Sequence, residues 1–253
     1  MKIRAAWFAP FWLLPFSLLA QTPAVPAPAV PTPAVPTMDH EPHHHLALHN
    51  DYVKVFNVEV APGDSIILHS HDQDTIAIAI GDQLVTVGIP GKTIPPSKNA
   101  DGQVRLQRAG YIHSTHVDGD TPYHTVAVEL MQPQTNFHNV CAEILPGMPS
   151  NCPQLDSNHR IVSNIQPLLE SNETSTWRII VLPHKSIELA NPSPRIIVAL
   201  DPLTISGTSK EPGKALKPGD YVWMDGGSGK GRVFKNNGTK DARFIEIDFK
   251  PAE

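Results

Sequence analysis

Three histidines have the types and the spacing of a metal site. His69 and His71 are separated by one residue in the segment 65–71, whose composition predicts a strand. Alternate residues of a strand point to the same face, so both imidazoles would project to one side. His113 follows a turn at Gly110, and the next strand can bring a third imidazole to the same point. Three neutral imidazoles suit Fe, Mn, Zn, Ni or Cu and leave coordination positions open.

The glycines around these histidines extend the pattern. The sequences Gly63-Asp-Ser-Ile-Ile-Leu-His69-Ser-His71, followed by Gly81, and Gly110-Tyr-Ile-His113 resemble the two signature motifs of the cupin superfamily. The resemblance implies a jelly-roll β-barrel over about residues 46–132, with one divalent transition metal bound by the three histidines. An isolated His-x-His pair fits a solvated strand face or hydrogen-bonded core histidines better, and the third histidine reverses that preference.

The sequence departs from these motifs at two positions. Thr75, with Asp74 beside it, stands where the resemblance expects a glutamate ligand, and Arg108 replaces a proline before the second-motif glycine. The departure implies a three-histidine site, or a site that Asp74 reaches through a local shift. Asp74, Thr75 and His116 are therefore candidates for supporting the ligands or lining a pocket, although ordinary strand or turn surface also explains His116.

Small side chains on the next strand predict free space inside the barrel. Thr75, Ala77 and Ala79 share the parity of the histidines, which leaves room for a ligand unless bulkier residues from other strands fill it.

An internal repeat predicts a second barrel. The stretch 46–68 resembles 168–189 in its apolar pattern and turn position, and Gly110 and Gly119 have counterparts in Gly229 and Gly238. The fold class is therefore all-β, with two tandem cupin-type jelly-roll barrels from a duplication, the second over residues 161–250. In the second copy, Ala190, Pro192 and Arg232 stand opposite the three histidines. We expect it to bind no metal and to act as a scaffold or lid.

Short runs rich in Val and Ile, bounded by Gly, Pro, Asn and Asp, support this fold class. The 26 prolines also favour short strands joined by turns over long helices. The predicted strands cover residues 53–60, 65–71, 75–80, 83–87, 124–130, 177–182, 195–200 and 243–249.

The N-terminus has the pattern of an export signal. Lys2 and Arg4 precede an apolar run that ends at Ala20, and two prolines interrupt it, which favours a signal peptide (residues 1–20) over a membrane anchor. Residues 21–45, rich in proline and then in histidine, are expected to form an extended tether. We therefore expect an exported protein, periplasmic or secreted, without stable membrane insertion.

The two cysteines lie in the predicted connection between the barrels, residues 133–160. In an oxidising compartment a disulfide between Cys141 and Cys152 is the natural interpretation. Free thiols or soft metal ligands are the alternatives, but two cysteines do not complete a tetrahedral site.

A second group of histidines lies where the tether meets the first strand. We interpret it as a solvated cluster without a role, since the tether is expected to be extended. It consists of His40, His43, His44, His45 and His49.

The net charge and the motifs narrow the range of functions that the sequence supports. A net charge of −5 and a pI of about 6.2 do not favour a nucleic-acid partner. The partner expected is a small molecule, and a homodimer through barrel faces is compatible with the fold. The resemblance implies a metal-dependent enzyme, such as a dioxygenase, isomerase or lyase, acting on a small organic acid, sugar or phenolic. The alternative is a non-catalytic module that binds a small ligand or metal.

Overall fold

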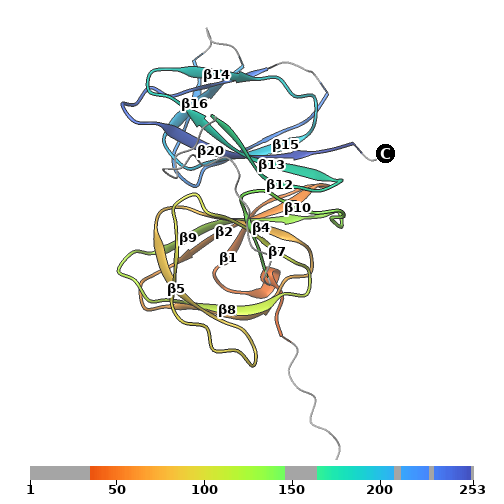
Figure 1. Ribbon diagram of the computed structural model, residues 1–253, viewed down its shortest axis with the longest axis vertical. Coiled ribbons are helices and arrows are strands. Elements are labelled where there is room, and N and C mark those ends of the chain that lie inside the picture. Colours follow the sequence, from red (N-terminus) through yellow and green to blue (C-terminus); the bar gives the residue numbers. More distant parts are fainter. Residues whose placement is uncertain (1–34, 146–163, 208–211, 228–230, 252–253) are drawn as a thin grey trace, which may run out of the picture. The chain divides into compact units, whose positions relative to one another are not determined.

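The computed structural model describes residues 35–145, 164–207, 212–227 and 231–251. The regular elements of these residues are almost all strands (Figure 1), and their one helical element is the 3-10 turn η1 (Met38–His40). No helix in the described ranges is suited to crossing a membrane. The predicted signal peptide and residues 21–34 of the predicted tether lie outside the described residues.

The first barrel combines a six-stranded and a four-stranded sheet. The larger sheet has the order β1 (His44–His49), β2 (Val53–Val60), β9 (Tyr123–Leu130), β4 (Thr75–Ala79), β7 (Val104–Gln107) and β11 (Glu143–Leu145). The smaller sheet has the order β3 (Ser65–Ser70), β8 (Ile112–Val117), β5 (Gln83–Gly88) and β6 (Ser97–Asn99).

The second barrel repeats this strand order. Its larger sheet runs β10 (His138–Asn139), β12 (Ile165–Glu170), β13 (Thr174–Val181), β20 (Ala242–Phe249), β15 (Arg195–Ala199) and β18 (Tyr221–Met224). Its smaller sheet runs β14 (Ser186–Leu189), β19 (Arg232–Lys235), β16 (Leu203–Ser206) and β17 (Lys214–Leu216). The structure confirms the all-β fold with two jelly-roll barrels, and every predicted strand is present with ends shifted by at most a few residues.

The central strands β4 and β15 are buried on both faces, which explains their continuous apolar sequences. One face of β4 carries Thr75, Ala77 and Ala79, with the parity predicted for the lumen. The other face carries Ile76 and Ile78, which belong to an apolar core shared with the second barrel. The larger sheets of the two barrels therefore pack against each other and form one hydrophobic core.

Polar contacts also join the barrels. Arg243 forms ion pairs with Asp201 of its own barrel and with Asp101 of the first barrel. The Arg178 guanidinium donates a hydrogen bond of 2.7 Å to the carbonyl oxygen of Gly102. Gly102 has a φ of +75°, and a Cβ there would lie 2.8 Å from the side chain of Leu200. A glycine is required at this close approach.

The connection adds one strand to each barrel. β10 pairs antiparallel with β12 of the second barrel, and β11 pairs parallel with β7 of the first. Cys141 lies between these two strands. Cys152 lies outside the described residues, so the predicted Cys141–Cys152 disulfide stays a prediction.

Residues 35–45 correct the prediction of a tether that extends to residue 45. Thr37 forms a β-bridge with Ser70, and Met38 is 1% exposed in a core cluster with Phe56 and Ile66. Burial of the Met38 side chain stabilises this segment on the barrel. We call residues 36–43 the N-terminal strap.

The register of the second barrel refines the comparison of the two copies. His69 pairs with His113 across β3 and β8, and Leu189 pairs with Arg232 across β14 and β19. Arg232 therefore occupies the predicted place of the third histidine. Leu189, and not the predicted Ala190, stands at the place of His69, because β3 contains a bulge before His69 that β14 lacks.

Candidate metal centre

The pairing of β3 with β8 brings the three histidines together. His69 lies directly opposite His113, and the backbone N–H of His71 donates to the carbonyl of Tyr111, which continues the pairing beyond β3. Gly110, with a φ of +81°, makes the turn that starts this return strand. One ligand nitrogen from each histidine lies within 4.8 Å of the other two. The motif spacing therefore produces a three-histidine group that could bind a metal ion.

Burial keeps these imidazoles in the form that binds metals. His69, His71 and His113 are 0%, 2% and 5% exposed. Burial, with the neighbouring histidines, holds the pKa of His71 well below its usual range. Burial and His69 lower the pKa of His113 to about 3. All three are therefore neutral near pH 7, with ring nitrogens available as donors to a metal.

The hydrogen bonds of His69 indicate whether its free ring nitrogen could bind a metal ion. Its Nδ1–H donates to the carbonyl oxygen of Ile67 at 2.9 Å, so Nε2 carries the lone pair. This Nε2 is buried and has no hydrogen-bond partner. The Nε2 atoms of His71 and His113 lie 3.0 Å apart. A divalent transition metal would satisfy the orphaned nitrogen, and a set of imidazole nitrogens suits such an ion.

Gln107 is a polar group of this site that the sequence interpretation missed. It lies on β7 directly opposite Thr75, the position where the motif has glutamate. Its side-chain amide is 3.3 Å from Nε2 of His113, and the residue is 8% exposed. The amide oxygen is a possible ligand atom if the side chain turns that end toward an ion. Residue 107 belongs to neither motif, so only the strand register identifies it.

The other predicted site residues separate into two groups. Thr75 is buried with its hydroxyl 3.2 Å from Nδ1 of His71, so it contacts a candidate ligand. Asp74 accepts hydrogen bonds from the backbone of Ala109 and pairs with Arg108, both at 2.9 Å. It thus holds the turn before Gly110 and is not in the three-histidine group. His116 is exposed and bonds to Ser65, away from that group.

The strap and the start of β1 add two residues next to the cluster, Glu41 and His44. Glu41 is 2% exposed and accepts hydrogen bonds from His44 Nδ1 at 2.7 Å and from the backbone N–H of His43 at 2.8 Å. Its other carboxylate oxygen accepts the backbone N–H of Ile67 at 3.2 Å. Burial alone would raise the pKa of Glu41, but the bonds from His44 and His43 hold it at about 2.

This network corrects the prediction for His44. Its ring centroid is 4.8 Å from that of His69, and its side chain is only 6% exposed. The expected solvated cluster describes His40, His45 and His49, which are exposed. His44 differs because a buried carboxylate holds it against a candidate ligand.

The space next to the histidines is small on the lumen side. A cavity of about 20 Å³ lies among Ala77, Ala79, Gln107 and bulkier polar residues, which is room for about one water molecule. The predicted small side chains do line the lumen. Asn99, Gln103, Arg105 and Tyr123, which come from other strands and the loops beside them, fill most of the space they leave.

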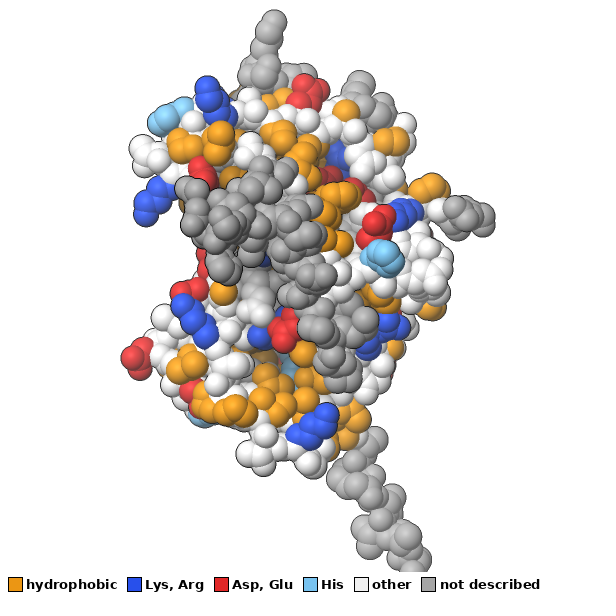
Figure 2. All heavy atoms as spheres, viewed as in Figure 1, with side chains coloured by type: hydrophobic (Ala, Val, Ile, Leu, Met, Phe, Trp, Pro, Cys, Tyr) orange, Lys and Arg blue, Asp and Glu red, His pale blue; other side chains and the backbone are white. Residues whose placement is uncertain are grey.

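A larger hollow of about 410 Å³ lies on the other side of Tyr111. Figure 2 shows hydrophobic side chains gathered over β5 and β8, the strands next to this hollow. Tyr111 lines the hollow, and its ring stacks on His113 with centroids 4.9 Å apart. Lys92 and Arg108 also line it, and the Arg108 guanidinium lies over the ring of Phe137.

No protein-family model and no curated protein matches the sequence. Solved structures do match. AerE from Microcystis aeruginosa aligns with 83% of this chain and 99% of its own length, at 13% identity and a TM-score of 0.51. A mutant of the salicylate 1,2-dioxygenase of Pseudoaminobacter salicylatoxidans covers 78% of this chain and 71% of its own, at 9% identity and a TM-score of 0.50. The 11S globulin of Wrightia tinctoria covers 83% and 82%, at 9% identity and a TM-score of 0.50. At these identities the likeness concerns the fold alone.

Proposed function

We propose that this chain, whose fold is that of the two-barrel cupin proteins, is a metal-dependent enzyme with its active site in the first barrel. His69, His71 and His113 would hold one divalent transition metal. The observation that carries the proposal is the convergence of three buried neutral imidazoles, one of which has an orphaned Nε2. When bound, the ion would supply a Lewis acid or redox centre with open coordination positions.

The proposed reaction is that of a dioxygenase, with an isomerase or lyase as the next choice, on a small organic acid, sugar or phenolic. Thr75 replaces the carboxylate ligand of the motif, and a three-histidine set favours oxygen chemistry over hydrolysis. Because salicylate 1,2-dioxygenase has a similar fold, small aromatic acids are the first substrates to test.

The chain's own residues fit such a substrate. Lys92 would attract a carboxylate to the hollow beside Tyr111, where Arg108 is already paired with Asp74. The other lining residues include Ile89, Pro90 and Ile112. Tyr111 contacts both the hollow and His113, so its ring would exclude water from the histidines. Glu41 and His44 hold the His69 ring from the strap side.

We also propose that the protein is exported, and the predicted signal peptide at residues 1–20 supports this. Mass spectrometry of the protein recovered from the periplasm or medium should find a mature N-terminus near residue 21. The same sample, alkylated without reduction, should show Cys141 and Cys152 unmodified because they are joined. Alkylation of both thiols would contradict the disulfide.

The test of the metal site uses protein purified without chelators or a histidine tag. Metal analysis should find about one transition metal per chain. His113→Ala should abolish binding, since two remaining imidazoles chelate weakly. His116→Ala is the matched control: it lies three residues further along β8 and its side chain is exposed, so it should bind metal as the wild type does.

Oxygen uptake with salicylate and related acids and phenolics then tests catalysis. Turnover in the wild type that is lost in His113→Ala and kept in His116→Ala would support the enzyme. Equal metal content in both variants would contradict the site itself.

A non-catalytic metal or ligand module is the second candidate. The observation that favours it is the lumen, where only about 20 Å³ is free beside the histidines. Such a module would bind one metal without turnover of any acid or phenolic in the panel.

A further inference from the structure

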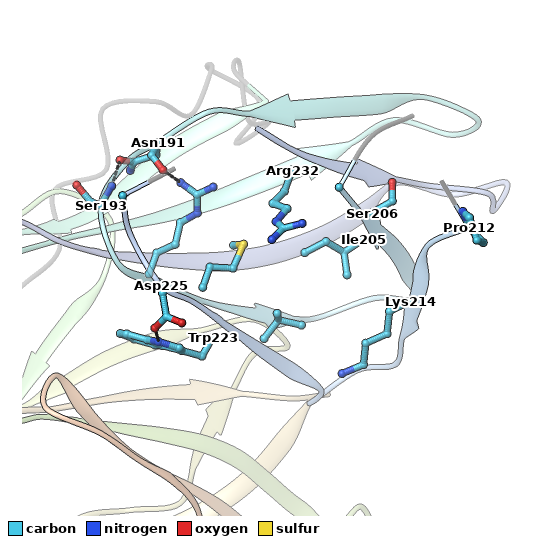
Figure 3. A pocket seen from close by; sticks show the side chains of 14 residues that line it. Asn191, Ser193, Ile205, Ser206, Pro212, Lys214, Trp223, Asp225 and Arg232 are labelled. Atoms are coloured by element: carbon cyan, nitrogen blue, oxygen red, sulfur yellow. Dashed lines mark hydrogen bonds between the residues drawn. The ribbon is translucent and has the colours of Figure 1, made fainter. Parts of the chain in front are cut away.

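The second barrel contains a cavity on the side where the first barrel has its histidines. Figure 3 shows Arg232 of β19, Ile205 of β16 and Lys214 of β17 around one space, with Trp223 of β18 at its edge. The Trp223 ring packs on Tyr52 and Phe249. The cavity is about 440 Å³, within the range of small-molecule sites. Loss of metal ligands in this copy has thus not led to a packed lumen.

In the second barrel, the position that corresponds to His113 carries a positive charge. Arg232 pairs with Leu189 as His113 pairs with His69. Its side chain is exposed to the cavity, as is that of Lys214. In the described part of the chain, neither side chain has a hydrogen bond or an ion pair. Two cations without partners are therefore available to a ligand.

A third cation, Arg195, is built into the wall. It is 2% exposed and donates to the carbonyl oxygens of Asn191 at 2.8 Å and Leu189 at 3.3 Å. Its Nε is buried without a hydrogen-bond partner and lies 3.5 Å from Glu246. Burial and the adjacent Asp248 raise the pKa of Glu246 to about 8, so its carboxyl is mostly protonated near pH 7. Asp248, which is hydrogen-bonded to Glu246, also interacts electrostatically with Arg195, so this acidic pair balances the Arg195 charge.

Among the described residues that line the cavity, one is acidic, and its carboxylate is already engaged. Asp225 accepts a hydrogen bond of 2.7 Å from the Trp223 indole N–H. The remaining walls include the apolar side chains of Ile205, Val222 and Met224. Two cations without partners, one engaged carboxylate and an apolar wall favour an anion that carries an apolar body.

We propose that the second barrel binds a small organic carboxylate, with its charge at Arg232 and Lys214 and its apolar body against Ile205, Val222 and Met224. This site is independent of the metal proposed for the first barrel. The second barrel would then be a binding domain and not only a scaffold.

The test is calorimetry of the full chain with benzoate. Benzyl alcohol keeps the ring without the charge, and inorganic phosphate keeps a charge without the ring. Benzoate should bind with a Kd of about 1 mM or tighter, and the other two probes at least about tenfold more weakly.

Variants locate the site. Arg232→Gln should weaken benzoate binding by about tenfold, the value of one charge-assisted hydrogen bond, and Arg232→Lys should restore part of it. Lys185→Gln, which removes an exposed cation of the same barrel outside the cavity, should change nothing. Because the first barrel is itself proposed to take small aromatic acids, the titration is repeated in His113→Ala, where the binding that Arg232→Gln weakens should remain.

Three results would overturn the proposal. The first is that benzoate does not bind at about 10 mM. The second is that phosphate binds as tightly as benzoate. The third is that His113→Ala removes benzoate binding while Arg232→Gln leaves it unchanged. The last result would place benzoate in the first barrel.

Discussion

At the scale of single residues, Gln107 is the feature that distinguishes this site from three histidines alone. Its amide lies 3.3 Å from Nε2 of His113, across the strand pair from the position where the motif has glutamate. An amide can contribute a weak oxygen ligand, whereas a carboxylate would contribute a charged one. The strand register thus places residue 107 where the missing ligand could be restored.

Gln107→Glu should therefore increase metal affinity, by about tenfold if the carboxylate reaches the ion. Competition against a chromogenic chelator would measure this with Mn²⁺ or Zn²⁺. Gln132→Glu is a suitable control, because residue 132 is exposed and does not line the small cavity. Unchanged affinity in Gln107→Glu would mean that the side chain points away from the ion.

Glu246 gives a prediction for stability against pH. Burial, with Asp248 beside it, raises its pKa from an ordinary value of 4.5 to about 8 in the folded protein. Between these values the folded state keeps a proton that the unfolded state has lost. Its contribution to stability therefore falls as the pH rises through that window, by at most about 1.4 kcal/mol per pH unit.

Glu246→Gln removes this titration. The melting temperature of the variant relative to wild type should rise between pH 5 and pH 8, by about 5 °C or more. Glu59→Gln, at a side chain that is 70% exposed, should melt in parallel with the wild type. Parallel curves for Glu246→Gln as well would show that Glu246 ionises normally in the folded state.

At the scale of elements, the strap stabilises the site through one buried carboxylate. Glu41 accepts bonds from His44, His43 and Ile67, and Ile67 also fixes the His69 ring through its carbonyl. Removal of this acceptor would leave buried donors without partners.

Glu41→Ala should therefore destabilise the protein by about 3 kcal/mol, or about 6–12 °C in melting temperature. It should also weaken metal binding by about tenfold, because His69 loses its support from the strap side. Chelator competition and thermal melts measure both effects, with Glu59→Ala as the exposed control. A loss of stability with unchanged metal affinity would mean that the strap supports the fold but not the site.

The strap also shows where sequence reasoning failed. Proline and histidine composition predicted an extended tether to residue 45, and the single methionine and glutamate that bury themselves in it give no periodic signal. The three ligands, in contrast, were predictable, because strand parity places His69 and His71 and the turn at Gly110 places His113.

Contacts between distant strands were harder to predict. Gln107 meets His113 only through the pairing of β4 with β7, which no local motif specifies. In the second barrel, the sequence indicated that Arg232 replaces a ligand. It did not indicate a cavity, because the side chains around it come from strands and loops far apart in the sequence. The residue at the place of His69 was predicted as Ala190 and is Leu189, because β3 contains a bulge. The composition of β3 does not indicate this bulge.

At the scale of the whole molecule, the two barrels share a core and should unfold together. Ile76 and Ile78 of the first barrel and Ile196 and Val198 of the second lie in one buried cluster. Tyr52 of the first barrel packs on Phe249 and on Trp223, with ring centroids 5.4 and 5.6 Å apart. Exposing this apolar surface would destabilise either barrel alone.

Metal binding in the first barrel should therefore stabilise the second. Tryptophan emission tests this, since Trp177 and Trp223 lie in the second barrel and the remaining two, Trp7 and Trp12, lie within the predicted leader. At a metal concentration about 100 times the Kd, the gain is about 2.7 kcal/mol, so the emission midpoint should rise by about 5–11 °C. His113→Ala should melt at one temperature with or without metal. A metal-dependent circular dichroism transition with an unchanged tryptophan midpoint would instead mean that the barrels unfold separately, despite the core between them.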